Sequence, residues 1–201
     1  MRIGIITTVN HNVGDDFVRE GIKFLLKERF RGIDLQFENI HKHAPITARY
    51  GFESFRNHEI SSIIDNDLPL ASTRDRVLEA DLLVQSGAPV FWCHDHGPHC
   101  FENEWYEPLI VRRFSRNRDR IQFINLAGGA CQAYHSNSVS LCINDRNYIK
   151  ELFLFSDITT VRDQLSKDIL NQLGMDAPVI PCTSIFARDN LRISEEHPKY
   201  V

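Results

Sequence analysis

The sequence predicts an α/β protein with a mostly parallel sheet and helices on both faces of that sheet. Short apolar runs rich in β-branched residues alternate with longer amphipathic runs along the chain. Glycine, proline or a helix-capping residue stands at most of the boundaries between them. This strand–turn–helix order implies βαβ units, in which parallel strands are buried on both sides. We therefore expect a Rossmann-like domain.

The first elements follow directly from the local pattern. Ile3–Thr8 is apolar and β-branched, so it predicts a buried strand. The turn at Asn12–Asp16 offers an N-cap for an amphipathic helix, which Gly32 ends. Ile33–Phe37 then alternates like a second strand. The predicted buried face of the helix consists of Val18, Ile22, Leu25 and Leu26.

The middle of the chain is less regular. Residues 39–71 form an ambiguous stretch in which we expect one short helix around Ser61–Ile64. Thr73–Ala80 has a helical pattern, and Asp81–Gln85 predicts a strand that Ser86–Pro89 ends. Glu104–Arg116 predicts the next helix.

The last third of the sequence repeats the alternation more clearly. The predicted strands are Ile121–Leu126, Ile158–Val161 and the short Val179–Pro181. The predicted helices are Asp145–Phe155 and Asp163–Leu173, the latter stopped by Gly174. We predict one domain over residues 1–187, and a polar tail or start of an inter-domain linker over 188–201.

Composition narrows the class of protein. A chain of 201 residues that is 42% hydrophobic and 25% charged can bury a core, which excludes a disordered chain and a disulfide mini-protein. The net charge of −4 argues against nucleic acid as a partner, because no chain-wide basic surface is available. Any anion must therefore be held by a few placed groups.

The sequence also indicates a compartment. No run approaches the ~18 apolar residues that a membrane span requires, and the apolar N-terminal run is too short for a signal peptide. The five cysteines are odd in number and form no Cys-x-x-Cys pair. We therefore expect a reduced, cytoplasmic protein.

Ligands of open parallel sheets bind beyond the carboxyl ends of the strands, so the turns there are the candidate site. After the first strand, Asn12, Gly14 and Asp15 either hold a ligand at a helix N-terminus or form a plain turn with Asp15 or Asp16 as the cap. Two acids would repel a phosphate, unless they bind sugar hydroxyls, a metal or a neighbouring arginine.

Small residues follow two further strands. Ser86 and Gly87, and then Gly128 and Gly129, allow close backbone approach to a ligand, although tight turns use the same residues. Arg162 and Asp163 follow the strand at 158–161. The planar guanidinium of Arg162 can donate two parallel hydrogen bonds to a phosphate or a carboxylate. The alternative is that Arg162 forms a structural ion pair with Asp163 or Asp16.

The last turn, Cys182–Ser184, contributes small polar residues to the same crevice. We expect Cys182 to be a packing residue rather than a nucleophile, because no histidine follows it closely in the sequence.

Together these turns resemble the polysaccharide pyruvyl transferase family, and specifically its N-terminal domain. The strongest similarity is the Val-Arg-Asp segment between a strand and a helix. The segments that resemble the family are, in chain order, Asn12–Asp15, Ala80–Val84, Ser86–Gly87, Gly128–Gly129, Asp157–Ser166 and Pro181–Phe186.

The resemblance implies one lobe of a two-domain, glycosyltransferase-like fold. Members transfer a pyruvyl group from phosphoenolpyruvate to sugar hydroxyls in a cleft between the two domains. Arg162 and Asp15 would be catalytic: Arg162 would bind the donor, and Asp15 would orient a sugar or an arginine. The resemblance implies no cofactor, and a second domain or chain would complete the cleft.

Histidines suggest further candidates. Cys93–Cys100 holds three histidines and two cysteines, whose side chains are ligands of zinc, but the spacing matches no standard finger and we assign no metal. His94 and His135 follow strand ends and are candidates for contact with the substrate. The rival functions are a non-catalytic sugar- or nucleotide-binding domain, a glycosyltransferase lobe and a small metal-binding protein.

Overall fold

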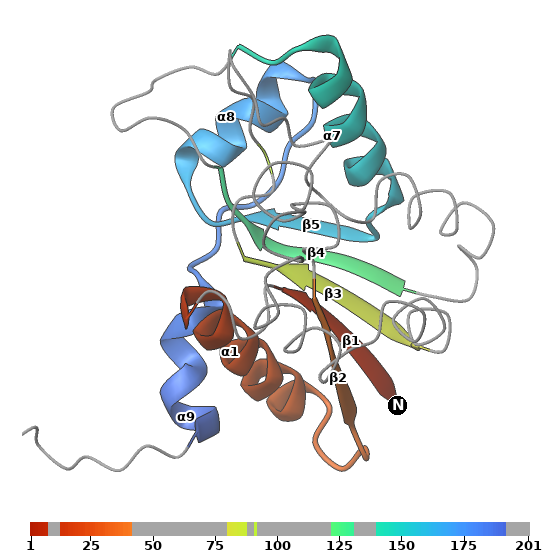
Figure 1. Ribbon diagram of the computed structural model, residues 1–201, viewed down its shortest axis with the longest axis vertical. Coiled ribbons are helices and arrows are strands. Elements are labelled where there is room, and N and C mark those ends of the chain that lie inside the picture. Colours follow the sequence, from red (N-terminus) through yellow and green to blue (C-terminus); the bar gives the residue numbers. More distant parts are fainter. Residues whose placement is uncertain (8–12, 42–79, 88–90, 92–121, 131–139, 192–201) are drawn as a thin grey trace, which may run out of the picture.

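A parallel sheet forms the centre of the molecule (Figure 1). The computed structural model describes residues 1–7, 13–41, 80–87, 91, 122–130 and 140–191. Its strands are β1 (Arg2–Thr7), β2 (Gln36–His41), β3 (Leu82–Ser86), β4 (Gln122–Gly128) and β5 (Ile158–Val161). They pair in the order β2-β1-β3-β4-β5, and every pair is parallel. The predicted α/β, Rossmann-like fold is confirmed.

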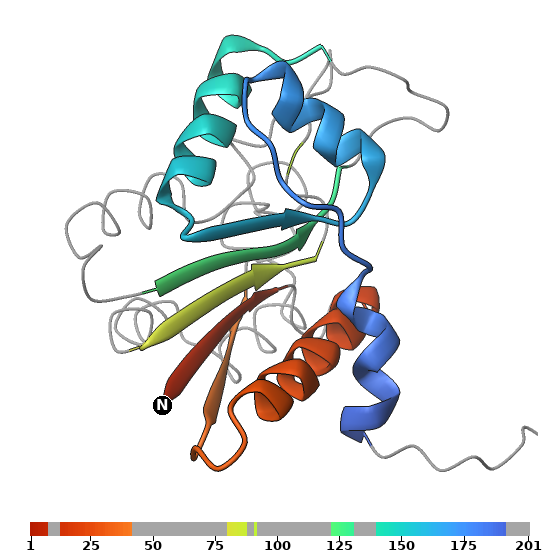
Figure 2. The ribbon, with the colours of Figure 1, turned by 180° about the vertical axis from the view of Figure 1, so that it is seen from behind.

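Helices cover both faces of the sheet (Figures 1 and 2). They are α1 (Val13–Arg29), α7 (Ile143–Phe155), α8 (Gln164–Gln172), a 3₁₀ helix (Thr183–Phe186) and α9 (Ala187–Leu191). The figures show α1 and α9 on one face, and α7 and α8 on the other. None of the described helices is long and apolar enough to cross a membrane.

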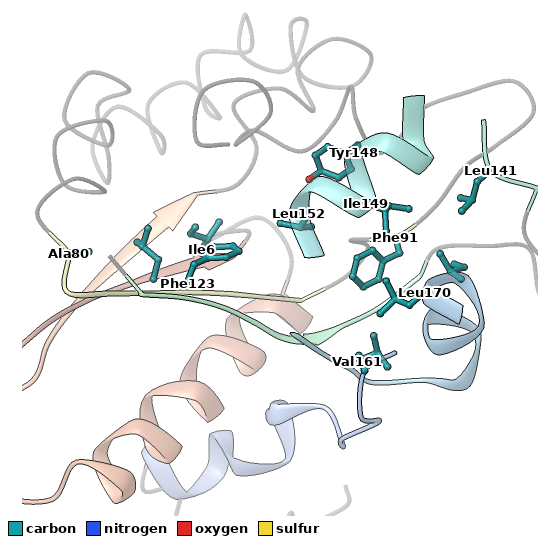
Figure 3. Close-up of a cluster of buried hydrophobic side chains, with 13 residues drawn as sticks. Ile6, Ala80, Phe91, Phe123, Leu141, Tyr148, Ile149, Leu152, Val161 and Leu170 are labelled. Carbon is teal, nitrogen blue, oxygen red and sulfur yellow. The ribbon is translucent and has the colours of Figure 1, made fainter. Parts of the chain in front are cut away.

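Each face has its own hydrophobic core, because alternate side chains of a strand point to opposite sides. On the α1 face, Ile3 and Ile5 pack with Val18 and Ile22. On the other face lies a second core, which Figure 3 shows. Its members include Phe91, Phe123, Tyr148, Ile149 and Leu152.

Several predicted boundaries shift. β2 begins at Gln36 rather than Ile33, whose side chain is exposed. The strand predicted at Val179–Pro181 is wrong, since only one bridge forms, between Val161 and Val179. Pro178 and Pro181 have no N–H to extend that pairing.

The aspartates after β1 do not cap α1. The helix already begins at Val13, so Asp15 and Asp16 lie inside its first turn, and the alternative in which one of them is the N-cap is wrong. The polar segment from Arg188 begins within α9. The helices predicted around 61–64, at 73–80 and at 104–116 fall on residues outside the described part, Ala80 excepted.

Candidate functional site

The strand order reverses its direction between β1 and β3. The chain leaves β1 toward β2 on one side, whereas β3 is followed by β4 on the other side. Where a parallel sheet reverses its order in this way, the loops beyond the carboxyl ends diverge and leave room for a ligand. Thr7 ends β1 and Ser86 ends β3 at this point.

A pocket of about 420 Å³ lies at this edge of the sheet. Its walls come from the first turns of α1, the end of β5 and the segment that enters the 3₁₀ helix. The described residues that line it are Gly14, Asp15, Phe17, Val18, Arg162, Cys182 and Ser184. The volume lies within the ~300–1,000 Å³ typical of small-molecule sites.

Arg162 is positioned by the end of β4. Its backbone N–H donates to the carbonyl of Gly128 at 3.1 Å, and its guanidinium lies against Gly129. A Cβ atom at position 129 would be only 2.3 Å from Nε of Arg162, so the glycine makes room for the guanidinium.

Within the described part of the chain, the guanidinium of Arg162 has donors available for a ligand. Its Nε lies 3.7 Å from Oδ2 of Asp163, which is long for a charge-assisted hydrogen bond. The expected contact of Arg162 with Asp163 is therefore present, but it is weak. Asp16, the other expected partner, pairs with Arg19 at 2.7 Å.

Asp15 is the acidic group of the pocket. Its side chain is buried, at 4% exposure for the residue, and its Oδ2 has no hydrogen-bond partner among the described residues. Gly87 has a φ of +94°, and a Cβ atom there would lie 2.7 Å from Oδ1 of Asp15. Gly87 therefore serves both a left-handed turn and close packing against the carboxylate.

Two buried hydroxyls lie at the carboxyl ends of β1 and β3. Thr7 and Ser86 are fully buried, and neither Oγ atom has a partner within the described part of the chain. Because a buried polar group without a partner costs roughly 1–3 kcal/mol, such groups tend to mark places where a ligand or a water binds.

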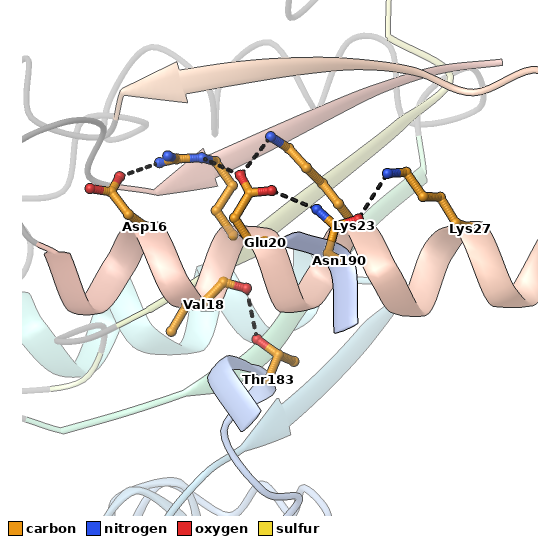
Figure 4. Close-up of polar contacts among 8 residues, drawn as sticks. Asp16, Val18, Glu20, Lys23, Lys27, Thr183 and Asn190 are labelled. Atoms are coloured by element: carbon orange, nitrogen blue, oxygen red, sulfur yellow. Dashed lines mark hydrogen bonds and ion pairs between the residues drawn. The ribbon is translucent and has the colours of Figure 1, made fainter. Parts of the chain in front are cut away.

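The segment that contributes Cys182 and Ser184 to the pocket binds to α1 through several contacts, of which Figure 4 shows the polar ones. We call residues 182–191 the strap. The hydroxyl of Thr183 donates to the carbonyl of Val18 at 3.0 Å. A Cβ atom at Gly21 would lie 1.8 Å from the Thr183 carbonyl oxygen, so this close contact requires glycine.

The far end of the strap is held by aromatic and polar contacts. The rings of Phe24 and Phe186 stack with their centroids 5.9 Å apart. Asn190 donates to Glu20 and accepts a hydrogen bond from Lys27 at 2.8 Å (Figure 4). These contacts fix one wall of the pocket relative to α1.

Asp163 has a structural role in the described part of the chain. It is the N-cap of α8, and its Oδ1 accepts from the backbone N–H and the hydroxyl of Ser166, both at 2.7 Å. This cap occupies one oxygen of a carboxylate that the sequence suggested for substrate binding.

The structure thus brings together several candidates that are far apart in the sequence. Gly14, Asp15 and Arg162 line one pocket. Gly87 and Gly129 support it through their contacts with Asp15 and Arg162. The carbonyl of Gly128 accepts from the N–H of Arg162, and Ser86 is the last residue of β3. Asn12, His94, His135 and the cysteine–histidine segment at 93–100 lie outside the described residues.

Sequence reasoning missed Phe17, which lines the pocket while remaining 43% exposed. The available signal was an aromatic residue that lies off the predicted buried face of α1, next to Val18. Among the described residues, no group of three or more histidine, cysteine or acidic side chains is arranged to hold a metal ion.

Comparison with models of known protein families finds no match for this chain, and comparison with characterised proteins finds none either. The assignment of a function therefore depends on the pocket itself and on the resemblance of its motifs.

Proposed function

We propose that this chain is a polysaccharide pyruvyl transferase-like protein, which transfers a pyruvyl group from phosphoenolpyruvate to hydroxyls of a saccharide. The observation that supports the proposal is that one guanidinium and one buried carboxylate line the same pocket. Arg162 and Asp15 reach that pocket from opposite ends of the chain.

The donor would bind at the positive side of the pocket. Phosphoenolpyruvate carries a phosphate and a carboxylate, and either fits the planar fork of Arg162. The N-terminus of α1, a helix of 17 residues, adds a partial positive charge next to Gly14. The ion pair of Asp16 with Arg19 offsets part of the negative charge in that first turn.

Asp15 would act on the acceptor. Its Oδ2 can accept a hydrogen bond from a sugar hydroxyl, which orients that oxygen for attack and makes it more nucleophilic. In the proposed reaction, the methylene carbon of the donor takes up one proton, and two sugar hydroxyls form bonds to the central carbon. The bond from that carbon to the phosphate oxygen breaks. Of the two hydroxyl protons released, one balances the methylene proton and the other leaves with phosphate.

The resemblance implies that the cleft is completed from elsewhere. A second domain or chain would supply the remaining contacts to the donor and the group that protonates its methylene carbon. Within this chain, Arg162 would bind the pyruvyl donor and Asp15 would bind the saccharide acceptor.

Calorimetric titration with phosphoenolpyruvate tests the donor site. A hydrogen bond to a charged group contributes about 1.5–3 kcal/mol, so Arg162→Ala should weaken binding by about tenfold or more. Arg162→Lys should recover part of the loss, because it keeps the charge but not the fork. Arg31→Ala, which removes a 76% exposed side chain paired with Glu28 on the surface, is the matched control.

The outcomes separate the rival functions. Equal affinities of the wild type and Arg162→Ala would remove Arg162 from the donor site. Binding of phosphoenolpyruvate without phosphate release, when a saccharide and the completing domain are present, would indicate a binding domain without catalysis.

A further inference from the structure

Phe17 is an apolar side chain that belongs to neither hydrophobic core of the described residues. It lies on α1 next to Val18, and Val18 and Ile22 bury the core-facing side of that helix at 3% and 0% exposure. Phe17 is 43% exposed and lines the pocket, and Val13, one turn earlier, is 70% exposed. A partly exposed aromatic ring in the wall of a pocket offers a flat surface to a ligand.

Asp15, two residues earlier, requires a ligand with a hydrogen-bond donor. Its carboxylate is buried at 4% exposure, and Oδ2 has no partner among the described residues. A carboxylate only accepts hydrogen bonds, so the group that binds there must donate them. Phosphoenolpyruvate with its ionised phosphate and carboxylate has acceptors alone, and its negative charge is repelled by Asp15. The group that binds Oδ2 of Asp15 is therefore a hydrogen-bond donor and not phosphoenolpyruvate itself.

A pyranose ring meets both demands at once. Its edge carries hydroxyl donors, and its faces carry C–H groups that pack on aromatic rings. We propose that Phe17 is the platform for the sugar ring of the acceptor, with the hydroxyl edge of that ring turned toward Asp15. The choice of a saccharide rests on the proposed function. Phe17 is then a specificity-determining residue that the motifs did not indicate.

Saturation-transfer NMR with the methyl glycosides of glucose, galactose and mannose tests this inference. We expect at least one glycoside to receive saturation at its ring C–H protons. Phe17→Ala should weaken that binding by about two- to tenfold, the range for one aromatic contact. Phe17→Trp should keep it, because a larger flat ring remains. Leu154→Ala, which truncates a 66% exposed apolar side chain on α7, is the matched control.

Two further measurements make the result decisive. Phosphoenolpyruvate affinity should be unchanged in Phe17→Ala, and thermal unfolding should show that each variant is folded. The inference is overturned if no glycoside binds the wild type, or if Phe17→Ala binds glycosides as the wild type does. It is also overturned if adenosine binds in a Phe17-dependent manner and the glycosides do not. If glycosides bind through Phe17 and phosphoenolpyruvate does not bind at all, the proposed donor fails and this inference stands.

Discussion

Replacing Gly129 by alanine should damage the site without damaging the fold. The new Cβ atom would lie 2.3 Å from Nε, 2.7 Å from Cζ and 2.8 Å from Nη2 of Arg162. Ordinary contact begins at 3.4 Å, so the guanidinium must move by roughly 1 Å. These atoms form the end of a flexible side chain that is 30% exposed. We therefore expect the free energy of unfolding to change by less than about 0.5 kcal/mol.

The effect of this movement on ligand binding should be much larger. A bidentate contact depends on the angle and distance of both N–H groups, and a shift of about 1 Å loses at least one of them. With about 1.5 kcal/mol for one charge-assisted hydrogen bond, Gly129→Ala should bind phosphoenolpyruvate about tenfold more weakly. Calorimetric titration measures the affinity, and denaturant unfolding measures the stability.

The neighbouring glycine is the matched control. A Cβ atom at Gly128 would lie 3.0 Å from Cε2 of Phe91 and 3.3 Å from Oδ1 of Asn125, in the core on the other side of β4. Gly128→Ala should therefore cost about 1–3 kcal/mol of stability through overpacking. Its effect on affinity should be much smaller than that of Gly129→Ala, because the Gly128 carbonyl that accepts from Arg162 remains. The reasoning would be refuted if Gly129→Ala bound phosphoenolpyruvate as the wild type does, or if both variants lost affinity equally.

Substitutions at three further positions test other parts of the structure. In an ordinary helix, a Gly→Ala substitution raises the stability by about 0.5–1 kcal/mol. Gly21→Ala should instead lower the free energy of unfolding measured in denaturant, because the new methyl group would clash with the Thr183 carbonyl. It should also weaken ligand binding, because the strap must move. Asp163→Ala should cost about 1 kcal/mol by removing the cap bonds to Ser166, whereas Asp163→Asn should keep most of the stability, which thermal melts would reveal. Gln85→Met should leave the melting temperature unchanged or raise it, because both amide atoms of this buried side chain lack partners among the described residues; a fall would reveal a partner of the amide.

The sequence was most informative where a local pattern determines the structure. β5 matches its predicted range of Ile158–Val161, because its β-branched run is bounded by polar residues. The start of β2 was not predictable in the same way. Gln36 pairs with Arg2 of β1, and its N–H donates to the carbonyl of Met1, so a partner far away in the sequence fixes the boundary.

The same difference between local patterns and long-range contacts applies to the candidate site. The rule that ligands bind at strand ends was sufficient to select Asp15, Arg162 and Gly129 as candidates. It could not show that Gly129 makes room for Arg162, because that contact joins two different strand ends. The sequence predicts a polar tail from Arg188 onward, since no local pattern shows that Asn190 bonds to α1.

Three glycines determine the shape of the pocket by what they lack. Gly87 faces the carboxylate of Asp15, Gly129 faces the guanidinium of Arg162, and Gly21 admits the strap. Only Gly87 has a left-handed φ, so the other two are needed for space rather than for backbone conformation. A chain with net charge −4 cannot attract an anion by its overall field, so binding must depend on where a few groups are held. Each of the three glycines gives room to a different part of the pocket. An alanine at position 87 should therefore disturb the proposed acceptor group Asp15, one at 129 the proposed donor group Arg162, and one at 21 the wall formed by the strap.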